Sequence, residues 1–268
     1  MNIVQTVAPI SVIIPCYRCA STIGRAVDSV FSQSITPAEV VVIEDCSGDE
    51  TLAALQELER IYQGRITIVQ MKANCGVASA RNAGWAIATQ PYIAFLDADD
   101  SWHPEKLRIQ YEYMSNNPDV VLCGHKCAWV IDETTPTVLS KDRAVTRISA
   151  HSLLFKNAFS TPTVMMKRNI PFRFADGQRY VEDAFLWQQI ALFGLAVARI
   201  ESDLAYIHKA PYGSAGLSAR LWKMERAELG NFVSHYRAGR IGSGLLLVVA
   251  VFSCAKHVRR ILMRPGGR

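Results

Sequence analysis

The sequence lacks any apolar run long enough to cross a membrane. Its longest strongly apolar stretch towards the end, residues 244–255, is shorter than the roughly 20 residues that a bilayer-spanning helix needs. The first eight residues also lack the charged start and the apolar core of a secretory signal. We therefore expect a chain that works in the cytoplasm.

A disulfide framework is absent as well. The seven cysteines are an odd number and lie mostly in apolar or motif contexts, which fits a reducing compartment. Cys16 and Cys19, together with Cys123 and Cys127, have a spacing that a zinc site could use. Zinc pairs usually sit on knuckles rather than at strand ends, so small buried hydrophobes are the favoured interpretation.

Glycine-rich phosphate loops are missing too. The first predicted strand, residues 11–14, runs into Pro15-Cys16-Tyr17-Arg18 and not into Gly-x-Gly-x-x-Gly. This disfavours a nucleotide-dependent oxidoreductase. A sugar nucleotidyltransferase, a related α/β enzyme, would also need a glycine-rich loop that the sequence does not have.

Positive charge is scarce outside the tail. Residues 220–268 hold ten Lys/Arg and two Glu, a balance of +8, whereas the other 219 residues hold 19 Lys/Arg and 22 acids, a balance of −3. A basic tail could bind nucleic acid, but no aromatic stacking platform accompanies it, so we expect no nucleic-acid partner.

What is present is an alternation of strands and helices in a globular chain of 268 residues. Short apolar runs predict strands at 11–14, 40–43, 66–69, 92–96 and 120–123. Helical spacing predicts helices at 21–33, 49–62, 76–88 and 104–114. This order is typical of a mostly parallel sheet with helices on both faces.

Polar residues follow three of the predicted strands, where ligands bind in such sheets. These segments are Pro15-Cys16-Tyr17, Glu44-Asp45-Cys46-Ser47 and Asp97-Ala98-Asp99-Asp100. Clustered carboxylates repel one another unless a cation or hydrogen-bond donors offset their charge, and oxygen ligands suit Mg²⁺ or Mn²⁺. An acidic turn before a helix start at residues 101–104 is the simpler alternative.

The second half is less regular. We expect strands near 127–131 and 163–166 around a variable loop at 132–147. A helix should open at Val181-Glu182-Asp183 and run to about Phe193, and another should span 217–236.

Five ordered blocks together resemble the family 2 glycosyltransferases, which have the GT-A fold. The blocks are residues 11–17, 42–49, 74–84 and 92–102 and the pair Glu182-Asp183, within a match over about residues 9–215. The second block usually reads Asp-Asp, whereas this chain has Glu44-Asp45. The resemblance implies a GT-A domain at 1–215, with a nucleotide-binding half at about 9–125, an acceptor half at 126–215 and a helical tail at 216–268.

The resemblance also implies roles for individual residues around a nucleotide-sugar, for which UDP is the expected nucleotide. Pro15, Tyr17 and Asp45 would meet the base, and Arg81 would reach the nucleotide or Asp99. Asp97 would contact the ribose or the metal, and Asp99 would be the most direct ligand of Mn²⁺ or Mg²⁺. From the residues alone, Tyr17 could pack on the core, Asp45 could cap a turn, and Arg81 could lie on the surface or pair with a buried partner.

Asp183 is the expected catalytic residue, because inverting members of the family use a carboxylate of this block as general base towards an acceptor hydroxyl. The pair Glu182-Asp183 could instead merely favour a helix first turn. Trp187, one turn later, could stack on an acceptor sugar or belong to the core, and Glu182 is a second acceptor-side candidate. His208 could ligate the metal or be structural. Residues 212–216 could form a loop that closes over bound nucleotide.

The tail favours a membrane surface. The apolar stretch 244–255 is followed by Lys256, Arg259, Arg260, Arg264 and Arg268, and basic residues are attracted to anionic lipid. We expect peripheral attachment to the inner face of the cytoplasmic membrane and a glycan or polyprenyl-diphosphate-linked acceptor, as in bacterial surface polysaccharide synthesis. A catalytically silent membrane scaffold is the alternative of another class.

Overall fold

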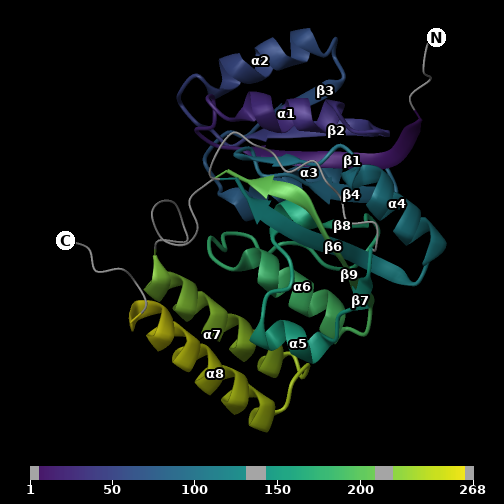
Figure 1. Ribbon diagram of the computed structural model, residues 1–268. Coiled ribbons are helices and arrows are strands. Elements are labelled where there is room, and N and C mark those ends of the chain that lie inside the picture. The colour runs from purple at the N-terminus through teal and green to yellow at the C-terminus, as the bar shows by residue number, and fades with distance from the viewer. Residues whose placement is uncertain (1–5, 131–142, 209–219, 263–268) are drawn as a thin grey trace.

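The computed structural model describes residues 6–130, 143–208 and 220–262. Its first half alternates strands and helices as the sequence predicts (Figure 1). The elements are β1 (Val7–Cys16), α1 (Ile23–Phe31), β2 (Thr36–Glu44), α2 (Thr51–Ile61), β3 (Ile66–Gln70), α3 (Val77–Ile87) and β4 (Tyr92–Phe95).

The second half differs more from the prediction. It contains β5 (Asp100–Trp102), α4 (Lys106–Asn116), β6 (Val120–Trp129), β7 (Val145–Arg147), α5 (Ala150–Phe155), the 3₁₀ turn η1 (Thr161–Thr163), β8 (Met165–Lys167), α6 (Glu182–Leu192) and β9 (Ala196–Ile207). Residues 100–102, where the simpler alternative placed an acidic turn before a helix start at 101–104, form an edge strand antiparallel to β9. The strand β7 and the helix α5 begin in or just after the expected variable loop, whose residues 132–142 lie outside the described residues.

All nine strands of the described ranges belong to one mixed sheet. Its order is β3-β2-β1-β4-β8-β6-β9-β5, with β7 paired to β9. The strands β1 to β4 are parallel, and β8 then reverses direction between β4 and β6. The carboxyl ends of β1, β2 and β4 therefore meet at one edge, which places the predicted polar segments together.

Helices cover both faces of this sheet, and alternate strand residues point into two cores. Val12 and Ile14 pack with α1, α2 and α4 on one face, whereas Ile13 packs with α3, α5 and α6 on the other. Both faces being covered explains why the strands read as continuous apolar runs.

The tail forms two helices at the edge of the molecule, α7 (Leu221–Arg237) and α8 (Ser243–Leu262) (Figure 1). They pack on α5 and α6 through a small core of Leu154, Phe232, Ile241 and Val249. The helix α8 extends beyond the expected apolar stretch at both ends. Among the described residues, no helix has the length and apolar character that a membrane span requires.

Candidate active site

A cavity of about 740 Å³ opens at the carboxyl ends of β1, β2 and β4. Its lining comes mainly from five parts of the chain: the end of β1 with the segment after it, the loop after β2, the start of α3, the loop after β4, and the segment that runs into α6. All the residues predicted to bind the nucleotide line this cavity: Pro15, Tyr17, Asp45, Arg81 and Asp97. Glu182 and Asp183, the two acidic residues at the start of α6, line it as well.

Tyr17 stands at the mouth of the cavity. It follows the end of β1 and keeps 46% of its surface exposed, so it is not packed on the core. The guanidinium of Arg18 lies 5.3 Å from the centre of its ring. An exposed aromatic face beside a cation is available for stacking on a planar base.

Asp45 holds the loop after β3. Its carboxylate accepts hydrogen bonds from the backbone N–H of Cys75 at 2.8 Å, from that of Gly76 at 2.9 Å and from the amide of Asn74 at 3.1 Å. It does not cap the turn at 47–51, where Glu44 accepts from the Ser47 N–H at 2.6 Å and Asp49 from the Thr51 N–H at 3.0 Å. Asp45 therefore joins β2 to the start of α3, and its neighbour Glu44 does the local capping.

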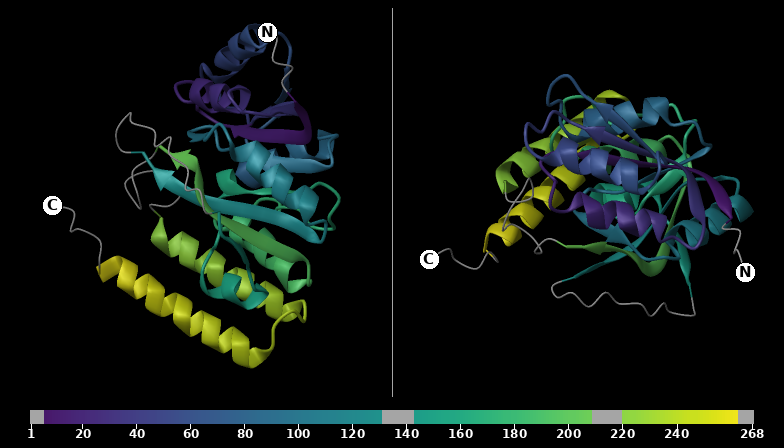
Figure 2. Two further views of the ribbon diagram at one scale, coloured as in Figure 1. Left: turned by 45° about the vertical axis from the view of Figure 1, so that its right-hand side comes forward. Right: turned by 90° about the horizontal axis from the view of Figure 1, so that it is seen from above.

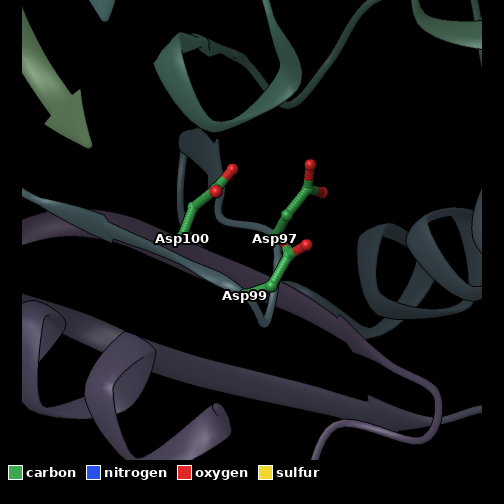
Figure 3. Close-up of side chains that lie close together, drawn as sticks. All are labelled: Asp97, Asp99 and Asp100. Carbon is green, nitrogen blue, oxygen red and sulfur yellow. The ribbon is translucent and has the colours of Figure 1, made fainter. Parts of the chain in front are cut away.

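Three aspartates form a potential metal site where the chain leaves β4. The carboxylate oxygens of Asp97, Asp99 and Asp100 lie within 4.8 Å of one another (Figure 3). An all-oxygen group of this size suits a hard divalent cation such as Mg²⁺ or Mn²⁺. Asp100, whose role the sequence left open, belongs to the group. Within the described ranges this is the only such cluster, so the four cysteines considered for zinc do not form a site.

Arg81 bridges the two acidic segments of the cavity. One guanidinium nitrogen lies 2.7 Å from a carboxylate oxygen of Asp97, and another lies 2.8 Å from Glu182. The side chain is buried, so these ion pairs replace its hydration. The alternative that Arg81 pairs with a buried partner is therefore correct. Its partners are Asp97 and Glu182, and not Asp99 as the resemblance implied.

Asp183 is half-buried in the first turn of α6. Its carboxylate accepts a hydrogen bond from the Ala184 N–H at 2.7 Å. Burial raises the pKa of Asp183 to about 7, and the negative charges of Glu182 and Asp97 add to this rise, while Arg81 opposes it. A carboxyl group with a pKa near 7 can accept a proton efficiently at neutral pH.

Two predicted site residues do not line this cavity. Trp187 has no exposed surface and packs edge-on against Phe174 at 5.9 Å in the core, so the prediction that it stacks on an acceptor is wrong. His208 is not part of the acidic group, and its Nε2 lies 2.8 Å from the Ser101 hydroxyl. Burial and the charge of Arg25 lower the pKa of His208, while the charge of Asp99 opposes this fall. The predicted closing loop at 212–216 lies outside the described residues.

Several residues in or beside the cavity were not predicted from the sequence. Arg179 and Tyr180 line it from the irregular segment before α6, and Met224 reaches it from α7. Arg25 of α1 donates to the backbone carbonyl of Asp99 at 2.7 Å. Arg179 and Tyr180 could have been suspected because they lie next to Glu182-Asp183 in the sequence. No sequence feature indicated Arg25 or Met224.

Comparison with known proteins identifies the family. A family model for glycosyl transferase family 2 matches residues 11–177. The chain belongs to this family. It is 42% identical over 105 residues to a Bacillus subtilis protein named TuaG for teichuronic acid biosynthesis, a match that covers 39% of this chain and 41% of TuaG.

A second relative is the Escherichia coli protein WfgD, named as a UDP-Glc:α-D-GlcNAc-diphosphoundecaprenol β-1,3-glucosyltransferase. It is 29% identical over 181 residues, which cover 68% of this chain and 69% of WfgD. The mannosyltransferase PcManGT from Pyrobaculum calidifontis, solved with GDP-Man and Mn²⁺, superposes with a TM-score of 0.66 at 18% identity, over 97% of this chain and 76% of that one. This likeness confirms the GT-A fold.

Proposed function

We propose that this protein transfers a sugar from a nucleotide-sugar, with UDP as the nucleotide, to a hydroxyl group of a glycan or lipid-linked acceptor in surface polysaccharide synthesis. The observation that carries the proposal is one cavity in which Asp183, a carboxylate suited to proton transfer, shares the lining with the acidic group and with Tyr17. WfgD, by its name, uses a UDP-sugar and a lipid-linked acceptor.

The nucleotide would lie across the ends of β1, β2 and β4. Tyr17 would stack on the base beside Pro15, and Asp45, already fixed by three donors, would accept from the base. Asp97, held by Arg81, would face the ribose or the metal. In this proposal Arg81 does not contact the nucleotide itself, and its role is to hold the carboxylates of Asp97 and Glu182 in place.

Asp97, Asp99 and Asp100 would hold Mn²⁺ or Mg²⁺, and their oxygen donor set supports this assignment. A bound divalent cation would offset the negative charge that develops on the departing diphosphate.

Asp183 would be the general base. Its carboxylate would take the proton of the acceptor hydroxyl as that oxygen attacks the anomeric carbon from the face opposite the nucleotide, which inverts the configuration. A positioned base contributes roughly 10²–10⁴-fold to such a step. Glu182 is paired with Arg81, so it would hold the start of α6 and thereby the position of Asp183. Direct contact with the acceptor would be a secondary role for Glu182.

The test is transfer by the parent and by Asp183→Asn with a panel of UDP-sugars, Mn²⁺ and a polyprenyl-diphosphate-linked acceptor. The amide keeps the shape but cannot take a proton, so we expect a fall of about 10²–10⁴-fold in kcat with donor affinity nearly unchanged. NMR of the product reports the inverted linkage.

Asp119→Asn, an exposed change outside the cavity, is the control. Transfer by Asp183→Asn within a few-fold of the parent would show that another residue is the base. A parent that neither transfers nor hydrolyses any donor would favour the alternative of a sugar-nucleotide-binding membrane scaffold.

A further inference from the structure

The helix α8 exposes its apolar residues and buries several of its polar ones. From Leu247 to Leu262, every exposed residue except Arg259 is apolar. Leu247 is 66% exposed, Val251 61%, Val258 54% and Leu262 78%. These four, with Val248 and Ile261, form a continuous strip along one side, the outer stripe of α8.

The opposite side of α8, which faces the protein, is partly polar. Ser253 and His257 are buried there beside Val249, and Ser253 Oγ and His257 Nε2 have no hydrogen-bond partner within the part of the chain that the structure describes. Lys256 pairs with Glu228 of α7 at 2.6 Å. A helix that only had to pack on this domain in water would be expected to have the reverse arrangement.

Two basic residues and one exposed tryptophan lie at the carboxyl end of α8. Arg259 and Arg260 lie in the last turn of α8. Trp222 of α7 is 73% exposed, and its ring lies 4.8 Å from that of His257. A basic end with an exposed tryptophan matches the interfacial region of an anionic bilayer.

We propose that the outer stripe of α8 lies in the interface of an anionic phospholipid bilayer, parallel to its surface. The helix is the outermost element on its side of the molecule, so a flat surface could reach the stripe (Figure 2). Interfacial helices combine such an apolar face with flanking basic residues.

The placement also orients the cavity. Met224, which lines the cavity, lies in the same turn of α7 as Trp222, which adjoins the basic end of α8. A protein bound through the stripe therefore holds the α7 rim of its cavity near the lipid surface. This step rests on the proposed function: in this position the cavity would admit an acceptor whose lipid chain is anchored in the membrane.

A second copy of the chain fits the stripe less well. Pairing two stripes would bring together two tails of balance +8 each, ten Lys/Arg against two Glu, and like charges at an interface oppose association. An anionic lipid surface offers the opposite charge.

The experiment is vesicle sedimentation with the full chain. The stripe variant carries Leu247→Gln, Val251→Gln and Val258→Gln, and the control carries Ile61→Gln, Ile87→Gln and Val145→Gln, three exposed apolar residues on other elements. On vesicles with 30% phosphatidylglycerol we expect at least tenfold weaker binding by the stripe variant and control binding within twofold of the parent. Arg259→Gln with Arg260→Gln should reduce the preference for anionic over neutral vesicles.

Donor hydrolysis in solution should be equal for parent and stripe variant, so loss of enzymatic activity and loss of lipid binding are separate results. Equal vesicle binding by parent and stripe variant, or no binding by the parent, would overturn the proposal. So would a parent dimer in size-exclusion chromatography that the stripe variant converts to monomer, because a second copy would then be the occupant. Circular dichroism melting checks that all variants fold.

Discussion

Charges of both signs act on the carboxylate of Asp183. Burial gives the largest rise in its pKa, Glu182 adds a second rise, and the guanidinium of Arg81 opposes both. Because Glu182 is itself paired with Arg81 at 2.8 Å, its charge is held in one place. Glu182 is thus a positioning residue whose effect on the reaction acts through the pKa of the base.

Replacing Glu182 by Gln should lower the pH at which transfer reaches half of its maximum. The change removes a negative charge beside Asp183 while keeping the side-chain shape, so the carboxylate ionises more easily. The measurement is the pH profile of kcat between pH 5 and 9. Glu201→Gln, remote from the cavity, is the control and should leave the midpoint in place. An unchanged midpoint in Glu182→Gln would contradict the electrostatic role.

The raised pKa of the Asp183 carboxylate lowers the stability of the fold at neutral and basic pH. The folded-state pKa of about 7 lies above the ordinary value of 3.8. The folded state therefore holds the proton more tightly, and its stability falls as pH rises between these values. Asp183→Asn removes this dependence, so it should stabilise the fold by up to about 4 kcal/mol at pH 8 and by little at pH 4. Thermal melting at both pH values tests this, and a loss of stability at pH 8 would contradict it.

At the scale of elements, the helix α3 approaches β1 closely enough to need glycine. A Cβ atom built on Gly84 would lie 2.5 Å from Ile13 Cγ2, at a buried contact between helix and strand. The same helix carries Arg81, and its N-cap residue Gly76 donates its N–H to Asp45. The distance between α3 and the sheet therefore helps to set the geometry of the cavity.

Gly84→Ala should destabilise the fold by about 1–3 kcal/mol, because overpacking forces the helix or Ile13 to move. Gly230→Ala is the matched control, since Gly230 lies in α7 with nothing within 4 Å of the position that a Cβ would take, and there alanine should add up to about 1 kcal/mol through its helix propensity. Chemical denaturation of both variants measures the difference. Equal free energies of unfolding for Gly84→Ala and the parent would refute the close contact.

The elements also indicate what a sequence can and cannot predict. The strands β1 to β4 are recognisable as apolar runs because both of their faces are buried. The strand β9 is not, because Arg199, Glu201 and Asp203 interrupt its apolar pattern and the residues of β6 that pair with it lie 75–78 positions earlier in the chain. Trp187 illustrates the same limit within α6, since helical spacing alone does not separate a core face from a site face.

The whole molecule brings distant segments to one cavity. Parallel strands predict that the polar segments after β1, β2 and β4 meet, and Asp45, Asp97 and Asp99 do line the same space. The contributions of Arg25, Arg179 and Met224 depend on tertiary packing of α1, the segment before α6 and α7, for which no local pattern exists. The site residues that follow strand ends could therefore be predicted from the sequence, because the sheet topology determines where those ends lie.

Binding of a nucleotide across this cavity should stabilise the whole fold in a metal-dependent way. A ligand that binds only the folded state at 100 times its Kd adds about 2.7 kcal/mol, which for a chain of this size raises Tm by roughly 5–10 °C. We expect that rise with UDP and Mn²⁺ together and a much smaller one with UDP and EDTA.

Asp99→Ala removes an oxygen donor of the acidic group, so the rise in Tm of this variant with UDP should no longer depend on Mn²⁺. Asp119→Ala, an exposed aspartate outside the cavity, should respond as the parent does. A full Mn²⁺-dependent rise in Asp99→Ala would show that the metal is held elsewhere.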